Sequence, residues 1–272
     1  MATAEGKVLY NKRLEKIQSE IDKLLAREET ILTLAKKDDA TSAYKLLVLV
    51  EDMIYLATMY LAKHKLSVTL LKSKNEASLN EARKTLYKSV IYLEDITTDY
   101  IDAPFSDYKE KLARIANISL TERYYLMRKL GLAIDMVIDA YGDNTKWRWS
   151  FVELQARFAT ISKNIIDLKD TIENGLDPRS DDYETAVFHL RLTKKLLSQA
   201  ADQYREKYEI ATSGTTSEDF KHAITYLNAL RRLYLILSER NEAEEVKRKI
   251  DIWQEKLEKD AIRRKKKHKF DG

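Results

Sequence analysis

The sequence predicts an all-α protein, an elongated bundle of long antiparallel, coiled-coil-like helical hairpins. Its 272 residues include 6 glycines and 2 prolines, whereas average usage would give about 19 and about 14. Sheet proteins need turns at short intervals, and this chain has few of the residues that make them. Hydrophobic residues at 44% and charged residues at 34% are instead typical of amphipathic helices.

The first two predicted helices differ in how much of their surface is apolar. Over residues 8–37, apolar side chains recur in steps of three and four, and Glu28 occupies one position of that seam. Residues 41–65 are apolar on nearly every side, which predicts a helix surrounded by other helices. The most apolar stretch, residues 43–62, is interrupted by Lys45, Glu51 and Asp52, so no transmembrane segment is predicted.

Local signals set the ends of the next helices. A third helix is predicted over residues 77–100, and Pro104 should break the chain before a short helix. Ser119, followed three residues later by Glu122, has the form of a capping box. It should begin a helix that Gly142 ends, because glycine commonly terminates helices.

Three further predictions cover the second half of the chain. Apolar residues step in threes and fours over residues 151–172, which predicts one long helix with a coiled-coil seam. The same pattern covers residues 183–208, with Lys194 at one polar position. After a loop over residues 213–217, residues 218–237 and 243–262 form the last predicted hairpin.

Charge and helix pattern together predict three parts. N-terminal hairpins occupy residues 1–142, C-terminal hairpins packed on them occupy residues 143–262, and a basic tail occupies residues 263–272. The tail has six basic residues and one acidic residue, a charge of +5, which leaves −1 for the rest of a chain whose total is +4. The basic residues of the tail are Arg263, Arg264, Lys265, Lys266, Lys267 and Lys269.

Motifs for catalysis and for cofactor binding are missing from the sequence. The absence of cysteine excludes disulfides and thiolate chemistry, and the absence of Gly-x-Gly excludes glycine-rich phosphate loops of that form. None of the four histidines forms a His-Glu-x-x-His or Glu-x-x-His pattern, and we interpret His189 and His222 as structural or surface residues. We therefore predict a non-enzymatic protein with no catalytic, cofactor-binding or metal-binding residues.

Aromatic residues beside cations are the candidate interface. Trp147 and Trp149 alternate with basic residues, Arg148 among them, and Tyr124 adjoins Tyr125. Tryptophan, tyrosine and arginine dominate the energetics of many protein interfaces. A hydrophobic staple that covers the core is the alternative role for one of the tryptophans.

Two classes of function follow from these features. The first is a structural or assembly protein that contacts other proteins along its long helices, as a filament component or by self-assembly. The alternative is a helical binding module whose basic tail docks on nucleic acid or an anionic membrane surface. Because the body of the chain is nearly neutral, it predicts no nucleic-acid groove.

Two resemblances bear on the first class. Tyrosine-rich, cysteine-free helical segments such as residues 54–61 and 86–93 resemble those of spirochaete periplasmic flagellar coiling proteins. The resemblance implies a non-enzymatic coat on the flagellar filament, located in the periplasm if the chain is a processed form and otherwise in the cytoplasm. The last hairpin is similar in part to a tetratricopeptide unit, at Leu227, Leu230, Tyr234 and Ala243.

Overall fold

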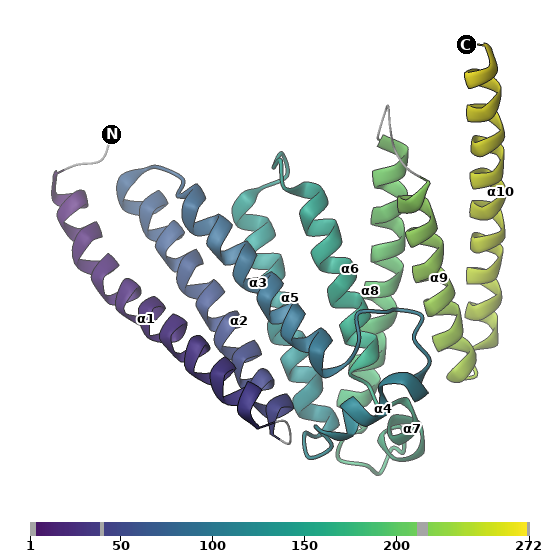
Figure 1. Ribbon diagram of the computed structural model, residues 1–272, viewed down its shortest axis with the longest axis horizontal. Helices are drawn as coiled ribbons and strands as arrows, with labels where there is room; N and C mark the ends of the chain where they lie inside the picture. Colours follow the sequence, from purple (N-terminus) through teal and green to yellow (C-terminus); the bar gives the residue numbers. More distant parts are fainter. Residues whose placement is uncertain (1–3, 39–40, 211–216, 271–272) are drawn as a thin grey trace. The chain divides into compact units, whose positions relative to one another are not determined.

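The computed structural model describes residues 4–38, 41–210 and 217–270, with side chains as far as Arg263. Throughout these residues the regular structure is helical, which confirms the predicted class (Figure 1). The elements are α1 (Ala4–Lys37), α2 (Ser42–Leu66), the π-helical η1 (Ser67–Leu71), α3 (Glu76–Ile96), α4 (Phe105–Ala113), α5 (Leu120–Tyr141), α6 (Arg148–Asn164), α7 (Leu168–Asp170), the π-helical η2 (Thr171–Gly175), α8 (Tyr183–Ile210), α9 (Glu218–Ile236) and α10 (Arg240–Phe270).

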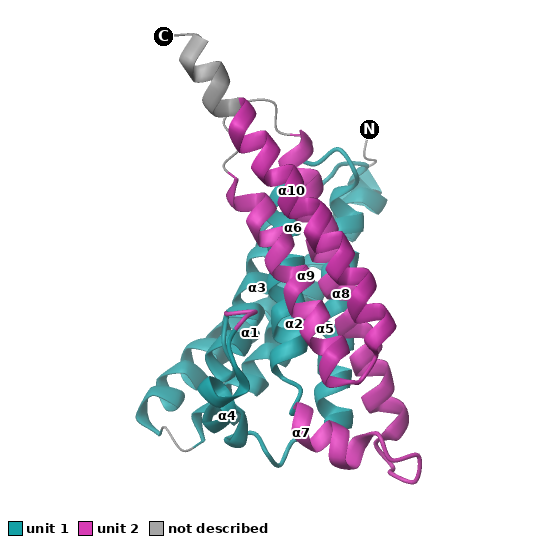
Figure 2. Ribbon diagram, turned by 90° about the vertical axis from the view of Figure 1, so that its right-hand side faces the viewer, with its two compact units in different colours: residues 1–99, 103–167 teal, residues 100–102, 168–272 magenta. Residues whose placement is uncertain are grey.

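The chain forms two compact units (Figure 2). Unit 1 consists of residues 1–99 and 103–167, and unit 2 of residues 100–102 and 168–272. The sequence suggested a division after residue 142, whereas α6 belongs to unit 1. Among the described residues no helix is both long and apolar enough to cross a membrane.

In unit 1, α2 packs between α1 and α3, and α5 and α6 contact the α2/α3 pair. Figure 1 shows α1, α2 and α3 as neighbouring antiparallel helices. Leu49, Met53, Leu86, Leu93 and Met127 are fully buried and form part of the core. Burial of such apolar side chains stabilises a helical bundle by about 1.5–3 kcal/mol for each large residue.

Three predicted helix ends in unit 1 are confirmed. Ser119 Oγ accepts a hydrogen bond from the backbone N–H of Glu122 at 3.1 Å, and Glu122 Oε2 accepts one from the backbone N–H of Ser119 at 2.8 Å. Pro104 is the N-cap of α4, and Gly142, with φ +79°, ends α5. The chemistry of each end lies within a few neighbouring residues.

Two predicted helices are wrong in length. The third helix ends at Ile96 rather than residue 100, and the hydroxyl of Thr97 donates to the Leu93 carbonyl at 2.9 Å. The long helix over residues 151–172 is also wrong, because α6 ends at Asn164. Asn164 Nδ2 donates there to the Thr98 carbonyl at 3.0 Å.

A buried arginine holds several backbone carbonyls near these helix ends. Arg123 on α5 is 5% exposed. Its guanidinium donates to the carbonyls of Ile115, Ile118 and Ile165 at 3.0, 3.0 and 3.2 Å. These carbonyls belong to the α4/α5 connection and to the C-cap of α6, where the negative end of a helix dipole favours a cation.

Unit 2 is built on α8, α9 and α10, with α9 packed against both of the others. The rings of Tyr208 and Phe220 stack at 4.8 Å, and those of Phe220 and Trp253 at 5.7 Å. The predicted hairpin of α9 and α10 is confirmed. The backbone of α10 continues as helix to Phe270, and Arg263 is exposed.

Two sequence predictions fall on parts that the structure does not describe. The structure does not describe the side chains of the other basic residues of the tail, which are Arg264, Lys265, Lys266, Lys267 and Lys269. Most of the loop predicted over residues 213–217 also lies outside them, and Ser217 is the N-cap of α9.

Each unit contains one of the two polar seam residues seen in the sequence. Glu28 on α1 accepts hydrogen bonds from Lys88 Nζ at 2.9 and 2.8 Å and from the hydroxyl of Tyr92 at 2.5 Å, both on α3. Lys194 on α8 donates to both carboxylate oxygens of Glu239 at 2.6 Å. Both charged residues therefore join elements that are distant in the sequence.

Candidate functional site

One face of α2 is open along much of its length. The side chains of this face recur at i, i+4, i+7 and i+11, namely Tyr44, Val48, Glu51 and Tyr55. Val48 is 39% exposed and Tyr55 is 47% exposed. The prediction that other helices surround this segment is therefore wrong for this face.

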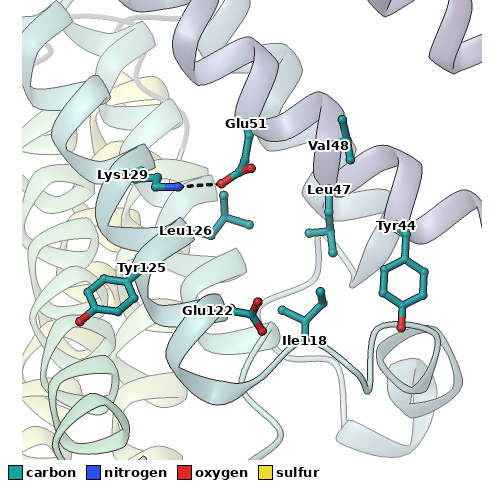
Figure 3. A pocket seen from close by; sticks show the side chains of 9 residues that line it. All are labelled: Tyr44, Leu47, Val48, Glu51, Ile118, Glu122, Tyr125, Leu126 and Lys129. Carbon is teal, nitrogen blue, oxygen red and sulfur yellow. Dashed lines mark hydrogen bonds and ion pairs between the residues drawn. The ribbon is translucent and has the colours of Figure 1, made fainter.

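A matching stripe lies on α5. It has the same spacing and consists of Tyr125, Lys129, Leu132 and Met136. Tyr125, Leu132 and Met136 are each more than half exposed. In Figure 3 the two helices run in the same direction on either side of the cavity, with Glu51 and Lys129 turned toward each other and Tyr125 pointing away from α2.

Between the stripes is a cavity of about 540 Å³, which we call the α2/α5 groove. Leu47 on α2 and Leu126 on α5 face each other across it, with Ile118 at one end (Figure 3). Leu47 and Leu126 are each less than a tenth exposed. The groove thus has an apolar floor flanked by exposed apolar side chains.

The charges at the groove are not balanced. Lys129 Nζ lies 2.7 Å from Glu51 Oε1, and this pair spans the groove at the end opposite Ile118. Glu122 also lines the groove, and hydrogen bonds from the Ser119 backbone and side chain lower the pKa of its carboxyl group. Since Glu51 and Lys129 neutralise each other, Glu122 leaves the lining with one negative charge at neutral pH.

The predicted interface residues do not form one cluster. Tyr124 is only 6% exposed, and its hydroxyl accepts a hydrogen bond from Arg128 at 3.1 Å. Tyr125 lies at the α2/α5 groove near the start of α5, whereas Trp147 follows the end of α5. At 1.5 Å per residue, Tyr125 lies roughly 24 Å along the helix from Tyr141, the last residue of α5.

The tryptophan segment forms a separate corner at the start of α6. Trp147 is the N-cap residue of α6 and is half-buried, with the guanidinium of Arg83 4.1 Å from the centre of its ring. Trp149 is also half-buried, and the guanidinium of the exposed Arg148 lies 4.9 Å from its ring centre. The interface role of these residues stays a prediction.

A second cavity of about 620 Å³ adjoins Trp147, and we call it the corner pocket. Its lining includes Lys74, Asn80, Tyr141 and Lys146. Tyr141 is 6% exposed, and burial raises the pKa of its phenol. The corner pocket therefore combines cations, aromatic rings and a buried hydroxyl.

The histidines do not form a metal centre in the described part of the chain. His189 is buried on α8, and His222 is exposed with its ring 5.3 Å from that of Tyr204. In the residues with described side chains, no group of three or more His, Asp or Glu residues is arranged to hold a metal ion.

The groove was not predicted, although the signal for it is present in the sequence. Over Tyr44 to Tyr55, the stripe repeats every three or four residues on a helix that already has an apolar core face. A second apolar stripe needs a second contact, either inside the fold or with a partner. Only the structure shows that this stripe is exposed.

The fold and the groove define an all-α protein built from packed helical hairpins, with an open apolar surface in unit 1. The chain belongs to the TP0443 family, whose model matches residues 6–261. This is a family of Treponema proteins. A search of curated proteins found no match.

Three solved structures are similar in fold at low identity. The "DHF58 filament" is 15% identical with a TM-score of 0.41, covering 90% of this chain and 99% of its own. The de novo designed helical repeat protein DHR64 is 15% identical with a TM-score of 0.38, covering 90% and 97%. A designed self-assembling cyclic homooligomer is 14% identical with a TM-score of 0.32, covering 90% and 97%. With TM-scores this low, no functional argument is drawn from them.

Proposed function

We propose that this protein is a non-enzymatic structural or assembly protein and that the α2/α5 groove is a contact surface for another protein. The exposed apolar side chains on both sides of the groove carry this proposal, since contiguous apolar patches on proteins commonly mark interaction sites. Val48 and Tyr125 line the groove itself, and Tyr55, Leu132 and Met136 are exposed further along α2 and α5. The missing catalytic motifs favour the same class of function.

The occupant that fits the groove is an amphipathic helix of a partner protein. Its apolar face would lie between the two stripes and place a large side chain over Leu47 and Leu126. A lysine or arginine on the partner helix would meet Glu122, whose lowered pKa keeps it ionised. The partner is thus expected to present a helix with an apolar stripe and a nearby cation.

Site-specific photo-crosslinking in the native organism tests the location of this surface. A photoreactive residue replaces Val48 in the groove, and the matched control replaces Leu34 on α1, which is 47% exposed. The expected result is one specific crosslinked protein at position 48 that is absent at position 34. Equal crosslinking at both positions would contradict the proposal.

The affinity for that protein then tests the energetics. Leu132→Ala should weaken binding about thirtyfold if Leu132 is an interface anchor, because such an anchor contributes about 2 kcal/mol. Since Leu132 is 54% exposed, the melting temperature should change little. Leu34→Ala is the matched control and should leave both quantities unchanged. Full affinity in Leu132→Ala and Tyr125→Ala together would show that the groove is not the contact surface.

A coat on the periplasmic flagellar filament is the narrower form of the proposal and rests on the sequence resemblance. Co-sedimentation of the purified protein with isolated filaments tests it. Saturable binding that Leu132→Ala weakens supports this role. A protein that stays in the supernatant at every concentration refutes the coat role and leaves the groove to another partner.

A further inference from the structure

The last helix of unit 2, α10, has apolar side chains on two sides. On the first side Ile250 and Trp253 are buried, and the Trp253 ring stacks on that of Phe220 in α9. On the other side Ile252 and Ile262 are 65% and 54% exposed. Exposed apolar side chains that recur along one side of a helix are typical of a helix that binds in a groove.

The two isoleucines belong to a stripe that recurs at i, i+3, i+7 and i+10, which we call the α10 stripe. It consists of Ile252, Glu255, Lys259 and Ile262, and all four side chains are exposed. Glu255 and Lys259 form an ion pair, so their charges cancel. Arg263, which is also exposed, adds a positive charge beside Ile262. The α10 stripe thus has the two features expected of a helix that fits the α2/α5 groove, an apolar side and a nearby cation.

The spacing of the stripe agrees with that of the groove. Ten residues separate Ile252 from Ile262, and ten also separate Leu126 in the floor of the groove from the exposed Met136. At 1.5 Å per residue, both separations are about 15 Å along a helix axis. If α10 lies antiparallel to α5 with Ile262 over Leu126, then Ile252 reaches Met136.

The charges agree in the same orientation. Arg263 follows Ile262, so it lies toward the start of α5, where Glu122 lines the groove. Glu122 is ionised at neutral pH, because hydrogen bonds from Ser119 lower the pKa of its carboxyl group. The single negative charge of the groove lining therefore meets a positive charge on α10.

We propose that the occupant of the α2/α5 groove is α10 of a second copy of this chain, an assignment that rests on the proposed role of the groove as a contact surface. The groove and the α10 stripe are different surfaces of the same protein. Each copy therefore uses its groove for one neighbour and its stripe for another. Such head-to-tail contacts produce an open filament or a closed ring rather than a symmetric dimer.

Two complementary variants test the head-to-tail contact by sedimentation velocity. Val48→Asp places a charge in the groove and Ile262→Asp places one in the stripe, and both positions are exposed enough to leave the melting temperature nearly unchanged. The unmodified chain should assemble as its concentration rises, whereas each variant alone should stay monomeric. An equal mixture should form a dimer that grows no further, because one intact groove and one intact stripe remain. An unmodified chain that is monomeric throughout, or a mixture without dimer, overturns the proposal.

Ile236→Asp is the matched control in unit 2. Ile236 is 50% exposed at the end of α9 and lies outside the α10 stripe. This variant should assemble like the unmodified chain. A loss of assembly as large as that of Ile262→Asp would show that a charge elsewhere in unit 2 has the same effect and would overturn the assignment of the stripe.

The absence of cysteine from the chain allows the contact to be mapped directly. A Val48→Cys variant and an Ile262→Cys variant, with tags of different size, are mixed and oxidised. The disulfide product that contains both tags should form about tenfold faster than the product of Leu34→Cys with Ile262→Cys, because docking raises the effective concentration of the paired thiols. Faster linkage of Val48→Cys to itself would identify a groove-to-groove dimer and overturn the head-to-tail contact.

Neutral substitutions test the charge pair. Glu122→Gln keeps a residue that suits the capping box, so the start of α5 is retained. Glu122→Gln and Arg263→Gln should each weaken assembly about threefold, as expected for an exposed ion pair. The double variant should lose no more than either single variant, because both remove the same interaction. Losses that multiply in the double variant would overturn this placement of α10 in the groove.

Photo-crosslinking at position 48 in the native organism separates this proposal from the more general role of the groove. A product with twice the mass of the chain, containing this sequence alone, supports a second copy as the partner. A product with a different protein overturns self-assembly through the groove but retains the groove as a contact surface. The absence of any specific product at position 48 refutes both.

Discussion

Glu28 in unit 1 and Lys194 in unit 2 occupy the same kind of position, a charged residue in an otherwise apolar helical seam. The Glu28 side chain is 7% exposed. The Lys194 side chain is 18% exposed and its partner Glu239 is 35% exposed. Glu28 receives bonds from two residues of α3, whereas Lys194 pairs with one carboxylate and lies 5.2 Å from the Tyr234 ring centre.

The comparison shows that burial, rather than charge, decides what a polar seam residue contributes. A buried carboxylate needs its partners, because removing one member of a buried network leaves the other unpaired. A pair that is partly in water loses less, because water replaces the missing partner. The two residues look equivalent in the sequence, but we expect their contributions to differ several-fold.

Of the substitutions that test this comparison, Glu28→Ala should have the largest effect on the free energy of unfolding. It removes the acceptor of the Tyr92 hydroxyl, which lies in a buried position, and leaves a cavity between α1 and α3. We expect a loss of about 3 kcal/mol in the free energy of unfolding of unit 1. Hydrogen exchange of α1 and α3 measures this for unit 1 alone. Glu29→Ala on the exposed side should change little, and an equal loss there would refute the role of burial.

Alkaline pH provides the second test. Burial and the hydrogen bond to Glu28 raise the pKa of Tyr92 far above its ordinary value near 10, and burial raises the pKa of Tyr108 to about 12. Both tyrosines stabilise unit 1 fully below pH 10, where they are protonated in the folded and unfolded states.

As the pH rises above 10, the unfolded state loses these protons first, so unit 1 is destabilised. Each tyrosine should shift the unfolding equilibrium by roughly tenfold per pH unit until its folded-state pKa is reached. Urea unfolding monitored by hydrogen exchange between pH 9 and 11 checks this. Tyr92→Phe should make the dependence shallower, and an unchanged slope would contradict the assignment.

Lys194→Ala should have the smallest effect. Because the ion pair with Glu239 is partly in water, we expect a loss of about 1 kcal/mol in unit 2. Hydrogen exchange of α8 and α9 measures it, with the exposed neighbour Lys195→Ala as control. A loss as large as that of Glu28→Ala would break the proposed difference between the two units.

The sequence predicted helix ends well where their chemistry is local. Ser119 caps α5 with a partner three residues away, and Pro104 caps α4 through its own backbone geometry. The sequence did not predict the helix ends that depend on residues distant in the chain. The predicted run over residues 151–172 stops because Asn164 bonds to Thr98 and Arg123 bonds to the Ile165 carbonyl. Periodicity carries no information about such long-range contacts.

The candidate site was predicted only in fragments. Tyr125 was selected as an aromatic interface residue and does line the groove, but its companions Glu51 and Lys129 are 78 residues apart. The role of Trp147 also depends on distant residues, because Lys74 and Tyr141 complete its pocket. Residue types suited to binding are recognisable in the sequence, but only the tertiary fold brings them together.

Arg123 has a consequence for the dynamics of unit 1. One guanidinium holds carbonyls from the α4/α5 connection and from the end of α6. Helix ends normally open one at a time, because each has its own capping group. Here the two segments share the guanidinium of Arg123 as donor. When one segment opens, the carbonyls of the other alone cannot accept all of its hydrogen bonds. Slow opening of the two segments should therefore be synchronous, even though 42 residues separate Arg123 from Ile165.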